Sequence, residues 1–168
     1  AVADTASGNE DLTTLTGNVG TNDTNKDSTE AYSLSGSATG SFGSLALGSN
    51  GAWTYTVDEA KRGQLNAITA NAVETFSYKV TDAAGNSTSS TLAITLTPVN
   101  DAPVNTVPGT QSTAEDTAKV ITGLSIADVD AGGSAVTVTL AVTNGVITAA
   151  TSTGVTITNN GTASVTRS

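Results

Sequence analysis

The chain has 168 residues, enough for one large domain or two ordinary ones, and its 15 acidic and 6 basic residues give a net charge of −9. That charge disfavours nucleic acid and anionic membrane surfaces as partners and favours cations. The chain has no Cys and no His, which excludes disulfides, thiolate and zinc sites and the usual catalytic triads, and no apolar run is long enough for membrane insertion.

The first hundred residues are predicted to form half-buried strands separated by turns. Alternation with period 2 recurs in three stretches: GAWTYTV at 51–57, ETFSYKV at 74–80 and STLAITLT at 90–97. In the first, Trp53, Tyr55 and Val57 share one face, which indicates a sheet packed on one side. Two polar stretches, at 45–53 and 81–88, predict hairpins because Gly, Ser and Asn favour tight turns.

Residues 57–70 predict one or two turns of helix that cross between two sheets. Ala60, Leu65 and Ile68 are expected to pack inward, and Gly63 keeps the helix short. The adjacent Asp58 and Glu59 could suggest the paired carboxylates of a glycoside hydrolase. We instead explain this pair by the helix dipole, because acidic side chains are stabilised at a helix start, and we expect no enzyme.

The stretch TPVNDAPVNT at 97–106 is predicted to be a joint between two β-domains. Pro98 and Pro103 restrict the backbone on either side of Asn100 and Asp101, so the linker is expected to be short and semi-rigid. We therefore expect a first repeat at residues 1–99 and a second at residues 100–168.

The second repeat also has strand-like stretches, but it is too short for a complete sandwich. They lie at 118–128, 135–149 and 154–166, separated by Gly and Asn turns. About 65 residues follow the linker, whereas a sandwich domain typically has roughly 100. An unpaired sheet edge is expected, which is either unfolded or open to a strand from another chain.

An internal repeat places acidic residues at matching positions. NEDLTTLTGNVGTND at 9–23 aligns with AEDTAKVITGLSIAD at 114–128, and the alignment matches these pairs: Glu10 with Glu115, Asp11 with Asp116, and Asp23 with Asp128. The match continues two residues further, where Asn25 corresponds to Asp130. A lone Asp in a polar loop is usually a turn former or a solvated charge. Several coincident positions instead favour a ligand cluster, since Ca²⁺ requires six to eight oxygen ligands.

Three motifs resemble those of a known family. VNDAPV at 99–104 resembles the linker of cadherins and bacterial cadherin-like repeats, residues 80–103 resemble their closing pair of strands, and DVDA at 128–131 resembles their Asp-x-Asp motif. The first repeat is similar as a whole to the VCBS-type repeats of large RTX-type surface adhesins. The resemblance implies an all-β fold of tandem immunoglobulin-like (cadherin-like) Greek-key β-sandwiches, the second incomplete, with joints that bind Ca²⁺.

The resemblance also implies a ligand set. At the internal joint it places Glu10, Asp82, Asn100, Asp101, Asp128 and Asp130, with Glu74 as a weaker candidate. Asp23 and Asn25 would serve a joint with a preceding domain, and Glu115 a joint with a following one. Because the linker lacks the family's additional Asp before and Asn after the Asn-Asp pair, one calcium ion is expected at this joint.

The expected function is mechanical: an extracellular spacer of a bacterial cell-surface adhesin, exported by type I secretion, which calcium stiffens to support cell adhesion or biofilm attachment. Its partners would be neighbouring repeats, with any host or cell-surface ligand bound by other domains. The alternative is a carbohydrate- or protein-binding sandwich module in which Trp53 or Tyr55 is exposed for stacking.

Overall fold

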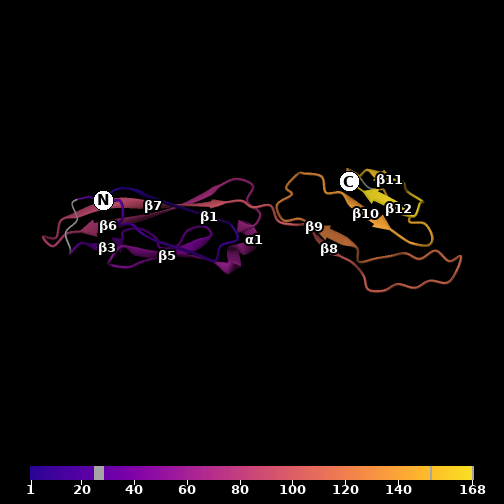
Figure 1. The fold of residues 1–168 in the computed structure, drawn as a ribbon, viewed down its shortest axis with the longest axis horizontal. Coiled ribbons are helices and arrows are strands. Elements are labelled where there is room, and N and C mark those ends of the chain that lie inside the picture. The colour runs from indigo at the N-terminus through magenta and orange to yellow at the C-terminus, as the bar shows by residue number, and fades with distance from the viewer. Residues whose placement is uncertain (25–28, 152, 168) are drawn as a thin grey trace. The chain divides into compact units, whose positions relative to one another are not determined.

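The computed structural model describes residues 1–24, 29–151 and 153–167 of the chain, shown in Figure 1. Its contacts divide the chain into two compact units, Ala1–Asp130 and Ala131–Ser168. The domain boundary expected at residues 99 and 100 falls inside the first of these units and stays a prediction.

Residues 4–97 form two facing sheets. One is four-stranded, in the order β1-β7-β6-β3, and is built from β1 (Asp4–Asn9), β7 (Ser87–Thr97), β6 (Ala72–Thr81) and β3 (Ala31–Leu34). The other is three-stranded, in the order β2-β5-β4, and is built from β2 (Thr14–Asn18), β5 (Ala52–Val57) and β4 (Gly43–Leu47). Strand β1 runs parallel to β7, whereas the other pairs are antiparallel. The first repeat is an immunoglobulin-like β-sandwich, as predicted.

The core of the sandwich follows the predicted alternation. Trp53, Tyr55 and Val57 are buried on one face of β5, and Phe76 and Tyr78 are buried on the facing strand β6. The rings of Tyr55 and Phe76 lie 6.1 Å apart in a tilted arrangement that joins the two sheets.

Both predicted hairpins are present. The β4–β5 turn places Gly51 at φ 82°, and the β6–β7 turn places Gly85 at φ 87°, a backbone region that glycine enters without steric penalty.

The predicted helical crossing connects β5 in one sheet to β6 in the other. It consists of a 3-10 turn, η1 (Glu59–Lys61), followed by α1 (Arg62–Leu65). Asp58 caps η1, since its Oδ1 accepts the N–H of Ala60 at 3.0 Å. Leu65 is fully buried, but the expectation that Ala60 packs inward is wrong, because the 3-10 turn that contains it buries no residue.

Beyond the linker the described residues form short strands, and none of those whose burial is described has a buried apolar side chain. In the first unit β8 (Val104–Thr106) pairs with β9 (Ser125–Ala127), and the second unit contains β10 (Val138–Ala141), β12 (Ser164–Arg167) and β11 (Ile157–Thr158) in the order β10-β12-β11. Of the described residues, the buried apolar ones all lie between Val19 and Leu96. Val120 is 83% exposed in a stretch expected to be a strand. The described residues beyond the linker therefore do not build a sandwich core of their own, and the incompleteness of the second repeat stays a prediction.

Candidate metal centre

Glu10 lies directly after β1, at the end of the sandwich from which the linker leaves. Its side chain is fully buried, its N–H donates to the Thr97 carbonyl at 3.0 Å, and its Oε1 accepts the N–H of Val99 at 3.0 Å. Its Oε2 is also buried, and no described residue donates to it. A buried carboxylate oxygen is destabilising unless a donor or a cation pairs with it. The buried, unpaired Glu10 Oε2 is therefore suited to bind a cation.

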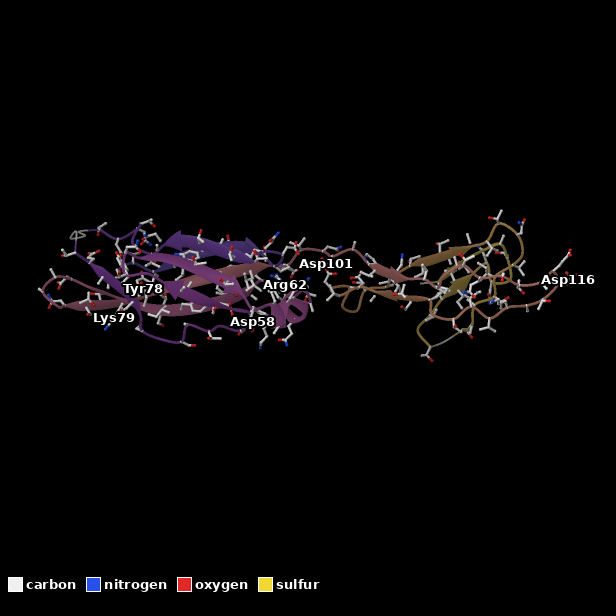
Figure 2. The ribbon with its side chains drawn as sticks, turned by 90° about the horizontal axis from the view of Figure 1, so that it is seen from below. Asp58, Arg62, Tyr78, Lys79, Asp101 and Asp116 are labelled. Carbon is white, nitrogen blue, oxygen red and sulfur yellow. The ribbon has the colours of Figure 1, made fainter. Side chains whose placement is uncertain are left out.

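Arg62 fixes the turn that carries Glu10. From α1 its guanidinium donates to the Glu10 carbonyl at 2.6 Å and to the Leu12 carbonyl at 2.9 Å. Glu59 binds the same guanidinium through two bonds of 2.7 and 3.2 Å, and this pairing lowers the pKa of Glu59. Arg62 and the linker residue Asp101 lie at the same end of the sandwich in Figure 2.

Asp101 and Asp130 are brought together across the linker. The N–H of Asp101 donates to Asp130 Oδ2 at 2.9 Å, and this bond lowers the pKa of Asp130 because it favours the ionised form. Asn100 donates to the Asp101 carbonyl at 2.8 Å. An open hollow beside the linker is lined by Asp101, Ala102, Val104, Ala127, Asp128 and Val129. Three of the predicted ligands, Asp101, Asp128 and Asp130, thus lie close together.

The linker backbone is held by carboxylates from both sides. Val99 donates its N–H to Glu10 of the first repeat, and Asp101 donates its N–H to Asp130 of the second. Because Val99 and Asp101 are two residues apart, their amide nitrogens are separated by at most about 7 Å. The Glu10 and Asp130 carboxylates therefore converge on one short stretch of chain.

Asp82 lies at the opposite end of the sandwich, so its expected place at the internal joint is corrected. It sits in the turn between β6 and β7 and accepts two bonds from Asn86, of 2.8 and 2.9 Å, which lower its pKa. Strand β7 then runs from Ser87 to Thr97, beside Glu10, a length of roughly 30 Å at about 3.3 Å per residue. The hairpin reverses the chain, and its turn points away from the linker that follows β7.

Glu74 is also used differently from the prediction. It is buried inside the sandwich, where Tyr55 donates its hydroxyl to Oε2 and Phe42 donates its N–H to Oε1 at 2.8 Å. Burial and the bond to Glu74 raise the pKa of Tyr55. Both oxygens of Glu74 thus have donors within the core.

Of the ligands predicted for neighbouring joints, Asp23 lies beside the N-terminal segment, away from the linker end. Asp23 holds the N-terminal segment, because its Oδ1 accepts the N–H of Val2 at 2.6 Å and its Oδ2 accepts the Tyr32 hydroxyl at 3.3 Å. Glu115 is exposed, in a turn. Asn25 lies outside the described residues.

A family model for the bacterial cadherin-like domain matches residues 1–98. The chain belongs to this family. Membership indicates an extracellular, adhesion-type repeat and agrees with the cadherin-like resemblance, while the finer assignment to VCBS-type or RTX repeats stays a prediction.

Solved structures similar to this cadherin-like chain include one described as the protocadherin gammaB7 EC3-6 cis-dimer structure. The identity is 15% and the TM-score 0.47, with 99% of this chain and 36% of that one covered. This chain therefore spans about a third of the length of that protein. No curated protein matches the chain.

Two alternatives for the cadherin-like chain lose their structural basis. Trp53 and Tyr55 are 6% and 0% exposed, so they form core and not a surface on which a sugar could stack. Asp58 and Glu59 have separate structural roles, as a cap and as the partner of Arg62.

Within the described ranges, no helix has both the length and the apolar character needed to cross a membrane.

Carboxylates alone do not complete a metal site in the described part of this cadherin-like chain. No three acidic side chains among the residues that the structure describes form a group that could hold a metal ion. A cation at the linker therefore needs amide or backbone oxygens in addition.

The role of Arg62 was not predicted from the sequence, although its position three residues after Glu59 is the spacing of a helical ion pair.

Proposed function

We propose that the chain is a spacer repeat of a large bacterial cell-surface adhesin, and that calcium bound at its linker stiffens the joint between the two repeats. The observation that carries the proposal is the buried Glu10 carboxylate. One of its oxygens holds the linker N–H of Val99, and the other is buried without a donor among the described residues. A divalent cation is the partner that such an oxygen lacks, and the chain's net charge of −9 favours its binding.

The ligands proposed for one calcium ion come from both repeats. They are Glu10 from the first repeat, Asn100 and Asp101 from the linker, and Asp128 and Asp130 from the second repeat. Calcium prefers such hard oxygen ligands and neutralises carboxylates that otherwise repel one another. Because an ion held by both repeats binds the docked arrangement more tightly than a hinged one, it shifts the population toward the docked state.

The same chemistry extends to an array of repeats. Asp23 and Asn25 are proposed to contribute to a joint with a preceding repeat, and Glu115 to one with a following repeat. Asp82 lies at the same end of the sandwich as Asp23, since β3 pairs Ala31 with Thr81 and its neighbour Tyr32 bonds to Asp23. Stacked repeats contact mainly their neighbours, so length grows with repeat number. Such a rod, exported by type I secretion in an RTX-type protein, would hold an adhesive tip away from the cell during biofilm attachment.

Thermal unfolding and small-angle scattering in calcium and in chelator test this function. Calcium is expected to raise the melting temperature and to produce a longer, narrower particle with a smaller spread of dimensions. A Glu10→Gln variant is the matched control, because it keeps an oxygen for Val99 but removes the charge. Superimposable curves for the wild type with and without calcium contradict the proposal.

A further inference from the structure

Two buried side-chain oxygens at the linker end of the sandwich share one unusual property. Among the described residues, Glu10 Oε2 and Asn66 Oδ1 are the buried side-chain polar atoms without a hydrogen-bond partner. Both are acceptors, so neither can satisfy the other. Each oxygen needs a hydrogen-bond donor or a cation as a partner. In the Asn66 side chain the buried atom is the amide oxygen, which is the atom that can bind a cation.

Asn66 and Glu10 belong to one clamped piece of structure. Asn66 ends α1, where its N–H donates to the Arg62 carbonyl at 2.9 Å. The Arg62 guanidinium donates to the Glu10 carbonyl at 2.6 Å. The fully buried Leu65 anchors the intervening turn in the core. A single residue, Arg62, thus ties the turn of Asn66 to the turn of Glu10.

Arg62 itself does not serve the two oxygens. Four of its hydrogen bonds go elsewhere, to the carbonyls of Glu10 and Leu12 and to both oxygens of Glu59. A guanidinium has five N–H donors, so its capacity is nearly used. The cluster therefore presents a carboxylate oxygen and an amide oxygen, which are ligands that calcium prefers.

We propose that Asn66 Oδ1 and Glu10 Oε2 bind the same divalent cation, so that Asn66 is a neutral ligand which helix α1 adds to the joint. This inference rests on the proposed function and names an additional ligand for it. It follows that part of the cation site is built within the first repeat, separately from Asp128 and Asp130. The Asn66 side-chain amide supplies one of the ligand oxygens that the cation needs in addition to those of the acidic side chains.

Calorimetric titration of the full chain with calcium chloride tests the role of Asn66. Asn66→Leu keeps the approximate size but removes the oxygen, and is expected to weaken the calcium Kd by tenfold or more. Asn71→Leu is the matched control, because Asn71 is exposed a few residues further along, and its Kd is expected to stay within about twofold of the wild-type value. Asn66→Asp replaces the neutral ligand by a carboxylate and is expected to bind calcium several-fold more tightly.

The outcomes separate this inference from the proposed function. If Glu10→Gln weakens binding while Asn66→Leu binds like the wild type, Asn66 is not a ligand although the joint still binds calcium. If neither variant differs from the wild type, the calcium site itself is elsewhere. Should Asn66→Leu fail to fold, the Asn66 side-chain amide signals in the NMR spectrum of the wild type decide. They are expected to shift on calcium addition while those of Asn71 do not, and unmoved Asn66 signals overturn the inference.

Discussion

Glu10 combines complete burial, a bond to the linker and a second oxygen without a donor among the described residues. Its sequence context shows none of this, because NEDL reads as a polar turn. Burial arises only when the Glu10 N–H joins the end of β7 and Arg62 closes over its carbonyl. The residue with the strongest claim to bind calcium is therefore distinguished by tertiary contacts.

The Glu10→Gln variant is expected to lose the response to calcium without losing stability in chelator. The amide oxygen still accepts the N–H of Val99, and the buried charge is removed, so the melting temperature in chelator should equal or exceed that of the wild type. Calcium at about 100 times its Kd should stabilise the wild type by roughly 2.7 kcal/mol and the variant by much less. Differential scanning calorimetry in both conditions measures this, and an equal calcium effect on the two proteins contradicts it.

Asp4 is expected to make stability depend on pH at the other end of the sandwich. Burial raises its pKa above the usual 3.8, the 2.6 Å bond from Tyr78 opposes this, and the charge of Asp23 adds to it. The folded state thus binds the proton more tightly, so this contribution to stability is complete below pH 3.8 and is lost as pH rises through the raised pKa.

Asp4→Asn keeps an acceptor for Tyr78 and removes that titration. The stability of the variant relative to the wild type should therefore increase from about pH 3.8 upward and level off above the folded pKa. Urea unfolding of both proteins at a series of pH values follows the difference. A difference that does not change with pH is the opposing result.

At the scale of elements, α1 connects the core to the linker end. Leu65 is fully buried, whereas Leu124 is 43% exposed, so the two leucines form a matched pair for substitution. Leu65→Ala should destabilise the chain by about 2–5 kcal/mol, because it leaves a cavity under the helix. Leu124→Ala should change stability by less than about 0.5 kcal/mol. Chemical denaturation gives both values, and similar losses in the two variants would show that α1 does not anchor the core.

The strands and hairpins of the first repeat could be predicted, because alternating apolar residues and glycine turns are local signals. The same alternation already placed Glu74 on the buried face with Phe76 and Tyr78, a signal that the ligand assignment overlooked. Asp82 could not be placed so easily, since the end of the sandwich it occupies depends on strand direction. Beyond the linker the predicted strand stretches contain only short strands, because alternation forms a sheet only where a partner covers one face.

At the scale of the whole molecule, the distribution of buried apolar side chains predicts two levels of protection of the backbone amides from hydrogen exchange. Buried apolar side chains of the described residues end at Leu96, while Val107 and Val120 are 70% and 83% exposed. Hydrogen exchange should therefore show strong protection in β5, β6 and β7 and exchange at least a hundredfold faster in β8 to β12. Mass spectrometry of exchanged peptides measures both regions. Equal protection would mean that the second repeat has a stability that its burial does not explain.

The joint itself is best tested by the backbone NMR signals of the isotopically labelled chain during titration with calcium chloride. The amides of Glu10, Val99, Asp101 and Asp130 are expected to shift together and to saturate at one ion, while that of Asp82 stays unchanged. A titration in which the linker amides do not move, or in which only residues far from the linker respond, would contradict a calcium-stiffened joint.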